Sequence, residues 1–471
     1  MSPKTVLLPA TLATMLIAAP PKPGTLQPIN LNLIAIDSHG QSVPGLTAED
    51  LQVFDNGKRR RIVWLRPLAQ TNPTSIFIVF DLLNSDFAAR ARSATEITEA
   101  LERLGIDDHV YLYLLSNAQR IRNPDARADA PARANFFAVH GVTARSEKPS
   151  DGIPWTRRVK PILDDALRQV NSLKSQEERL PELRIQPTWS ALGALIPQLA
   201  AIPGPKSFIW ITQGVENGFS DHRDTTPIRI FAANLNALET LGFSVEQRPD
   251  GSVPVNGEGS RTDTLTQISE LTGGRVLPSD YTDEAISRAF AAANQMNYRI
   301  AFESDHLDGK YHKLRVFSTR KDIRIQTAGH YYALPDADAQ SRAEAAENAI
   351  GRSPFDFDEI GITVAVIPVE EAPGQFRFSV RVNAQDVELI REGTRYKGSV
   401  DVEVIGARGQ LAPVATQDID LSEEDYARSL KDGIVLTHHE KLDPAATRVR
   451  VIVFDRHSYL AGTATAPVKA R

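Results

Sequence analysis

The chain has 471 residues, which is too many for one compact core and predicts about three domains. It contains no cysteine, which excludes disulfides, thiolate catalysis and zinc sites built on cysteine. Its formal net charge is -6, whereas nucleic-acid-binding domains are basic, so we expect no nucleic-acid partner.

Residues 1–24 have the pattern of a signal peptide or leader. Lys4 precedes a mostly apolar run over residues 6–19, and a proline-rich stretch follows it. A signal peptide implies a secreted or periplasmic protein, and a disordered leader is the alternative. No later segment approaches ~20 consecutive apolar residues, so we expect no transmembrane segment in the mature chain.

Residues 28–70 are predicted to form a small N-terminal β unit. A strand over residues 30–37 leads to a single helical turn with Thr47 as its N-cap, and Asn56-Gly57 is a strong hairpin signal. A unit this small is too short to be stable alone. The basic run at residues 58–61 favours a solvated turn over a site for an anionic partner.

Residues 73–333 alternate helix and strand patterns, which predicts a doubly wound, mostly parallel sheet. The run over residues 75–81 is apolar without alternation, as in a strand buried on both faces. Thr272-Gly273-Gly274 is expected to end a helix, with a glycine in the left-handed conformation. The predicted helices cover residues 86–104, 155–175, 189–201, 226–241, 263–271 and 283–296, and a β meander closes the region.

The remaining chain is predicted to be a helical linker, residues 334–358, and a C-terminal β-sandwich, residues 359–471. Strand patterns over residues 363–369, 375–382, 398–405 and 449–455 have the spacing of a sandwich.

Several motifs occur in a characteristic order. They are the turn-rich segment 37–58 ending in D-N-G-K, FDLLNS at 80–85, PGPKSFIWITQG at 203–214, L-T-x-I-S-E-L-T-G-G at 265–274, and Y-R-I-A-F, Y-H-K-L-R-V and G-H-Y-Y between 298 and 332. Over residues 31–333 the chain resembles the VWFA-related proteins first described in acidobacteria. The resemblance implies a von Willebrand factor A-like fold for residues 73–333.

The resemblance also implies a divalent-cation site at the carboxyl edge of the sheet. The wider family's motif is D-x-S-x-S, with a Thr on a second loop and a later Asp. Asp81, Ser85 and Thr188 match three of these positions, which suit Mg²⁺, Mn²⁺ or Ca²⁺. Two positions depart from the pattern: Leu83 replaces the first Ser, and Gln213 replaces the later Asp.

The alternative is a metal-free fold in which Asp81 and Ser85 cap the following helix and bind loop amides. With or without a metal in this degenerate site, Asn84, Gln213 and Glu216 are predicted to join Asp81, Ser85 and Thr188 in a rim that binds a protein partner. Residues 438–440 and 221–224 hold metal-ligating residue types but lack a spaced partner, and we expect exposed loops there. The sequence has no metalloprotease, P-loop, dinucleotide-binding or nucleophile-elbow motif.

Three functions remain open. The first is an exported, non-enzymatic, adhesion-like module in which the sheet rim or the β-sandwich binds a protein partner, and we favour the rim. The second is a structural or assembly component of the cell envelope. The third is a secreted hydrolase that uses carboxylates such as Asp81 and Glu216.

Overall fold

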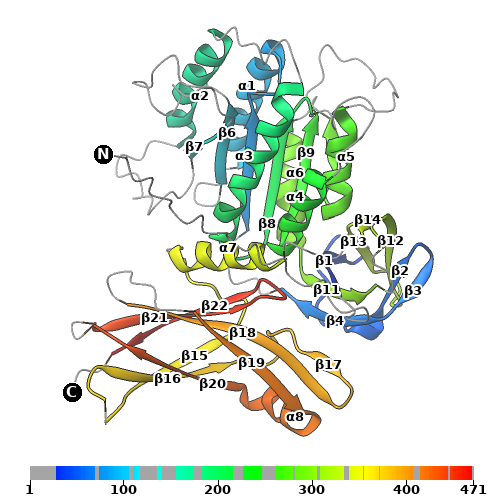
Figure 1. Ribbon diagram of the computed structural model, residues 1–471. Helices are drawn as coiled ribbons and strands as arrows, with labels where there is room; N and C mark the ends of the chain where they lie inside the picture. The colour runs from blue at the N-terminus through cyan, green and yellow to red at the C-terminus, as the bar shows by residue number, and fades with distance from the viewer. Residues whose placement is uncertain are drawn as a thin grey trace, which may run out of the picture.

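The computed structural model describes residues 28–68, 74–104, 110–116, 135–140, 155–172, 182–215, 226–246, 261–278, 282–304, 308–333, 339–353, 355–370, 372–406, 414–443 and 446–468. These residues form an α/β unit, a β unit beside it, and a C-terminal group of β-sheets below it in the view of Figure 1.

The α/β unit is built on a six-stranded sheet in the order β10-β9-β8-β5-β6-β7. Five strands are parallel, and the edge strand β7 runs antiparallel to β6. The strands are β5 (Ser75–Asp81), β6 (Val110–Ser116), β7 (Asn135–His140), β8 (Lys206–Thr212), β9 (Thr240–Glu246) and β10 (Val276–Pro278). The prediction of a mostly parallel central sheet is therefore confirmed.

Helices cover both faces of this sheet, which explains why its central strands are apolar without alternation. Phe77 and Val79 of β5 share a core with α3, α4 and α5, whereas Ile76 and Ile78 share another with α1, α2 and α6. The helices are α1 (Phe87–Leu104), α2 (Trp155–Ser172), α3 (Glu182–Ala200), α4 (Thr226–Ala237), α5 (Arg261–Thr272) and α6 (Thr282–Gln295).

Helix α3 begins seven residues before the predicted start at residue 189, so Thr188 lies inside a helix and not on a loop. Pro187 lies inside this helix, although an interior proline removes a main-chain hydrogen bond. The helix continues through it because the fully buried Leu192 and Leu195 anchor α3 in the core.

The N-terminal strands pair across the predicted boundary with the strands after α6. Strand β1 lies antiparallel to β11 and β13, and β2 lies antiparallel to β12. Residues 28–67 and 298–332 thus form two sheets around one core, and the meander does not belong to the α/β sheet. The elements are β1 (Pro28–Ile36), η1 (Ala48–Asp50), β2 (Leu51–Asp55), β3 (Lys58–Arg60), β4 (Ile62–Pro67), β11 (Tyr298–Glu303), β12 (Tyr311–Ser318), β13 (Arg324–Thr327) and β14 (His330–Tyr332).

The C-terminal residues form two antiparallel sheets that share one apolar core. One sheet has the order β15-β16-β20, and the other has β17-β18-β21-β22 with β19 beside β18. The elements are β15 (Ile362–Pro368), β16 (Gln375–Val382), β17 (Ile390–Glu392), β18 (Arg395–Ile405), β19 (Ala415–Ser422), α8 (Glu423–Asp432), β20 (Ile434–Lys441), β21 (Arg448–Asp455) and β22 (Ala461–Pro467).

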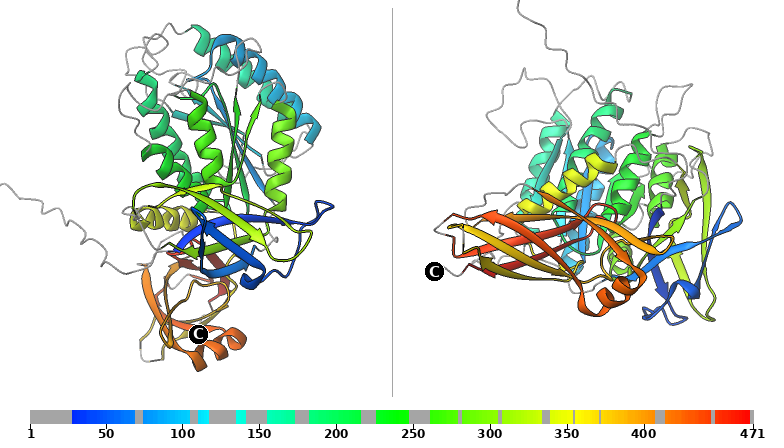
Figure 2. Two further views of the ribbon diagram at one scale, coloured as in Figure 1. Left: turned by 90° about the vertical axis from the view of Figure 1, so that its right-hand side faces the viewer. Right: turned by 60° about the horizontal axis from the view of Figure 1, so that its bottom comes forward.

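Helix α7 (Ala339–Arg352) lies between the α/β unit and the C-terminal sheets, as both Figure 1 and Figure 2 show. Ala343 and Ile350 of this helix share an apolar cluster with α3 and with Ile452 and Phe454 of β21. The segment expected to be a linker is therefore a packed element that joins two units through a common core.

Candidate functional site

The residues between β5 and α1 carry the predicted rim. The structure brings Asp81, Asn84 and Thr188 together, and all three side chains are buried. Ser85 is also buried, at 2% exposure. The expected cluster forms, but it lies beneath the surface and does not line an open edge.

The Asp81 carboxylate accepts five hydrogen bonds from protein donors. Its Oδ1 accepts from the amides of Leu83 (3.0 Å) and Asn84 (2.8 Å). Its Oδ2 accepts from Asn84 Nδ2 (2.9 Å), Trp210 Nε1 (3.1 Å) and Thr212 Oγ1 (2.8 Å). An ionised carboxylate has about four lone-pair sites, so these donors leave it no free acceptor position.

Burial raises the pKa of Asp81, and the hydrogen bonds from Asn84, Thr212 and Trp210 oppose that rise. Since each of these donors favours the ionised carboxylate, they offset the cost of holding a charge away from water. The Asp81 carboxylate therefore serves as a buried hydrogen-bond acceptor for the surrounding protein donors.

Asn84 joins two residues that the sequence placed in the metal site. Its Nδ2 donates to Asp81 Oδ2 and to Thr188 Oγ1, each at 2.9 Å. Thr188 reaches this position from inside α3, and its side chain is fully buried.

Gln213 does not join the Asp81 cluster. Its Oε1 accepts from the Asp86 amide (2.8 Å), and its Nε2 donates to Asp86 Oδ2 (2.9 Å). Asp86 Oδ1 accepts from the Ala89 amide (2.8 Å), so Asp86 caps α1 where Asp81 and Ser85 had been expected to do so. Burial raises the pKa of Asp86, but the hydrogen bonds from Ala89 and Gln213 outweigh it and hold that pKa below its ordinary value. Glu216 lies outside the described residues.

The arrangement does not fit a divalent cation as it stands. Both Asp81 oxygens are occupied, Gln213 is paired elsewhere, and Leu83 packs into the apolar core on the α3 side of the sheet. Among the residues described, no three His, Cys, Asp or Glu side chains lie together where they could hold a metal ion.

Trp210 and Thr212 are the contributors that sequence reasoning missed. Strand register pairs Val79 of β5 with Trp210 of β8, which places Asp81, Trp210 and Thr212 on the same face of the sheet. Once β5 and β8 are known as neighbours, the period-two alternation is enough to predict this contact.

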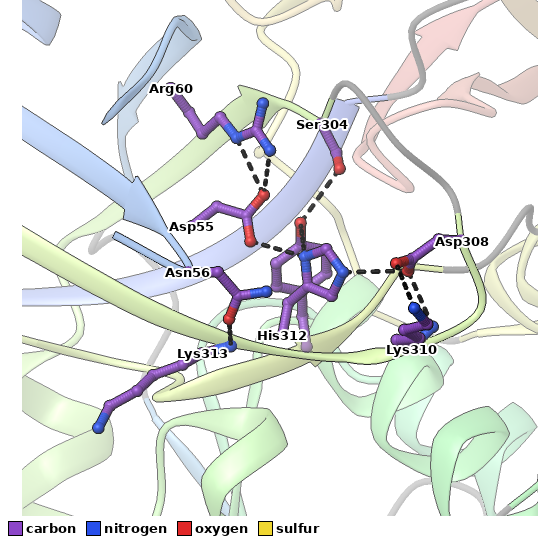
Figure 3. A network of polar contacts seen from close by, with 9 residues as sticks. Asp55, Asn56, Arg60, Ser304, Asp308, Lys310, His312 and Lys313 are labelled. Carbon is purple, nitrogen blue, oxygen red and sulfur yellow. Dashed lines mark hydrogen bonds and ion pairs between the residues drawn. The ribbon is translucent and has the colours of Figure 1, made fainter. Parts of the chain in front are cut away.

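A second buried polar cluster lies in the β unit (Figure 3). Asp55 Oδ2 accepts from Arg60 Nε (2.9 Å), and Asp55 Oδ1 lies 2.6 Å from His312 Nδ1. His312 Nε2 lies 3.0 Å from Asp308 Oδ1, so the imidazole is held between two carboxylates. The Tyr331 hydroxyl lies 3.1 Å from Ser304 Oγ and 3.3 Å from His312 Nδ1.

This cluster explains the D-N-G-K and Y-H-K-L motifs structurally. Asn56 Oδ1 accepts from the Lys313 amide (2.9 Å), which fixes the hairpin turn against β12. Lys58, Arg59 and Arg61 are exposed, and Arg61 pairs with Glu303 at the surface. Within the basic run, only the buried Arg60 departs from the solvated turn that the sequence favoured. These motifs maintain the fold.

His438 is likewise not on an exposed loop. It lies on β20 with 8% exposure, and its ring faces Phe378 in the core between the C-terminal sheets. Burial lowers the pKa of His438, as expected for an imidazole held in the core. Residues 221–224 lie outside the described residues.

No family model matches the chain, and no curated protein matches it. Solved structures that are similar to it include the pilus adhesin SpaC from Lactobacillus rhamnosus GG, in two forms, and the human COPII-coat protein Sec24c. The SpaC forms are 8% and 9% identical over 89% of this chain and 57% and 56% of theirs, each with a TM-score of 0.26. Sec24c is 12% identical over 64% of this chain and 49% of its own, also with a TM-score of 0.26.

This chain therefore spans little more than half of SpaC. A TM-score of 0.26 is too low to support a shared fold or function. Within the part of the chain that the structure describes, no helix is both long and apolar enough to cross a membrane.

Proposed function

We propose that this chain is an exported, non-enzymatic protein-interaction module of the von Willebrand factor A-like type. The ordered motifs over residues 31–333 and the doubly wound sheet with a polar cluster at its carboxyl edge support this proposal. Export is proposed from the leader pattern of residues 1–24 and places the protein in the periplasm or outside the cell.

The observation that carries the proposal is an exposed aromatic residue at a rigid rim. Phe87 is the first residue of α1 and is 66% exposed. It follows Asp86, which is held by Gln213 and by its cap bond to Ala89. Phe is among the aromatic residues that are enriched in the cores of protein interfaces relative to the rest of the surface.

Site-specific photo-crosslinking tests this function. A photoreactive phenylalanine analogue replaces Phe87, and the full chain is incubated with proteins from the cell envelope of its source. The control carries the same analogue in place of Phe317, which is 50% exposed on β12 and lies in the β unit away from the rim. We expect a discrete adduct from position 87 only.

The same partner then provides a quantitative check. Phe87→Ala is expected to weaken its binding at least tenfold, or about 1.4 kcal/mol, whereas Phe317→Ala leaves binding unchanged. Equal adducts from both positions, or equal affinities of both alanine variants, would contradict recognition at the rim.

A structural role in the cell envelope is the second candidate, favoured by the way the units are joined. Arg66 on β4 donates to the carbonyls of Asp386 (2.8 Å) and Val387 (2.6 Å), and Arg299 on β11 donates to that of Ser458 (2.7 Å). These partly and fully buried contacts suit a rigid spacer. The hydrolase reading is disfavoured because the enclosed Asp81 carboxylate has no free acceptor position for a substrate proton.

A further inference from the structure

We propose that the side-chain amide of Asn84 takes the place of a divalent cation, so that the rim is held in one state without metal. The proposal goes beyond partner recognition, because it concerns what holds the edge together and not what binds to it.

The geometry of the Asn84 amide carries the inference. Its two N–H groups point to the Asp81 carboxylate and to the Thr188 hydroxyl, both at 2.9 Å. Those two oxygens come from different elements, β5 and α3, and a cation at this position would have to bridge the same pair. The amide orientation follows from chemistry, since an ionised carboxylate only accepts and must face the NH₂ group.

Asn84 is not the only group that acts in place of a cation, because other hydrogen-bond donors also surround Asp81. Trp210, Thr212 and the amides of residues 83 and 84 supply Asp81 with the partial positive charge that a cation would otherwise provide. A cation entering here would have to displace these bonds within a buried site.

The loop is also fixed by packing. Leu83 is 5% exposed and belongs to the core beneath α3, and its carbonyl accepts from an Arg184 guanidinium nitrogen at 3.0 Å. Leu83 stands where the family's motif has a serine ligand, and it anchors the loop in the apolar core. The positively charged Arg184 lies against the same loop.

The decisive variant is Asn84→Asp, which is nearly isosteric but replaces the two donors with a second carboxylate. In EDTA we expect its melting temperature to fall by several degrees, because two buried carboxylates and a hydroxyl then face one another. Added Mg²⁺ or Mn²⁺ should raise it again in a saturable way, since a bound ion stabilises the native state.

Two controls accompany this variant. The wild-type chain is expected to melt at the same temperature in EDTA, Mg²⁺ and Mn²⁺. Asn84→Ala removes the donors without adding a carboxylate, so it should be destabilised and remain indifferent to metal.

A saturable rise of the wild-type melting temperature with metal, abolished by Asp81→Asn, would overturn the proposal even if Asn84→Asp failed to fold. An Asn84→Asp variant that matches the wild type in EDTA, or that metal does not rescue, would overturn it as well. The photo-crosslinking from position 87 is independent of these outcomes, so failure of the partner proposal is distinguishable from failure of this one.

Discussion

Asp81 is the residue on which the rim depends. In the sequence it can be read as a metal ligand or as a local cap, and both readings place it at the surface. In the structure, Asp81 is instead 0% exposed. Its carboxylate accepts hydrogen bonds from loop amides, from the Asn84 side chain and from β8. Its role is to hold strand ends and loop together.

This role predicts a large stability effect for Asp81→Ala. Several buried donors would lose their acceptor, and leaving such groups unsatisfied costs about 1–3 kcal/mol each before relaxation. We expect a loss of about 3 kcal/mol or more in the free energy of unfolding, measured by chemical denaturation.

Asp86→Ala is the matched control, since Asp86 lies five residues away and is exposed. It removes a helix cap and should cost only about 1 kcal/mol. Similar, small losses for both variants would show that Asp81 is not the structural acceptor described here.

Among the elements, the turn between α5 and β10 shows how closely two segments can approach. Gly273 has φ +82°, which confirms the left-handed residue expected from the sequence. Gly274 follows with a different constraint: a Cβ there would lie 1.9 Å from the carbonyl oxygen of Gly242 in β9. The pairing of β9 with β10 therefore requires a residue without a side chain.

Gly274→Ala is expected to destabilise the chain by about 3 kcal/mol, because the clash is with backbone and a rotamer change cannot relieve it. The control is Gly193→Ala in α3, where a Cβ meets no atom within 4 Å. Alanine there should stabilise by about 0.5–1 kcal/mol through reduced backbone entropy in the unfolded chain. Denaturation midpoints that shift in the same direction for both variants would contradict this account.

Most elements of the α/β unit were predictable, whereas several C-terminal strands were not. β5 and β8 are continuous apolar runs and β16 has a clear pattern, so local sequence defines them. β22 consists of small residues with weak strand propensity, and β20 carries histidines and a glutamate. These strands exist because neighbouring strands supply their hydrogen bonds.

At the scale of the whole molecule, buried charges lie where the units meet. Lys206 donates to the carbonyls of Ile202 (2.8 Å) and Gly204 (2.7 Å), and the Gly204 amide donates to Glu359 (3.0 Å) at the start of the C-terminal unit. Burial raises the pKa of Glu359 to about 7. Burying these charged groups costs desolvation free energy, and their partners are satisfied in one arrangement of the α/β unit and the C-terminal unit.

Glu347 on α7 gives this joint a measurable pH dependence. Burial, with Asp401, Glu403 and Glu344 nearby, raises its pKa from 4.5 to about 7, and Arg456 at 3.8 Å opposes the rise. Since the folded chain binds this proton more tightly than the unfolded chain, the contribution to stability is full below pH 4.5 and is lost as the pH rises towards about 7.

Glu347→Gln should therefore raise the melting temperature relative to the wild type at pH 8 and change it little at pH 4. The exposed Glu344 on the same helix provides the comparison, and Glu344→Gln should change the pH profile far less than Glu347→Gln, because Glu344 is the smallest of the named contributions to the raised pKa of Glu347. A Glu347→Gln profile parallel to that of the wild type would show that this carboxyl does not titrate in the joint.

The α/β character of the centre, its buried strands and the glycine turn after α5 could be predicted from the sequence alone. Each of these follows from periodicity or turn chemistry within a few neighbouring residues. Tertiary structure alone decided that β1 pairs with β11 and that Thr188 lies inside a helix. It also decided that the Asn84 amide turns inward to the oxygens expected to bind metal. Those features depend on packing between segments far apart in the chain, and local propensity does not encode that packing.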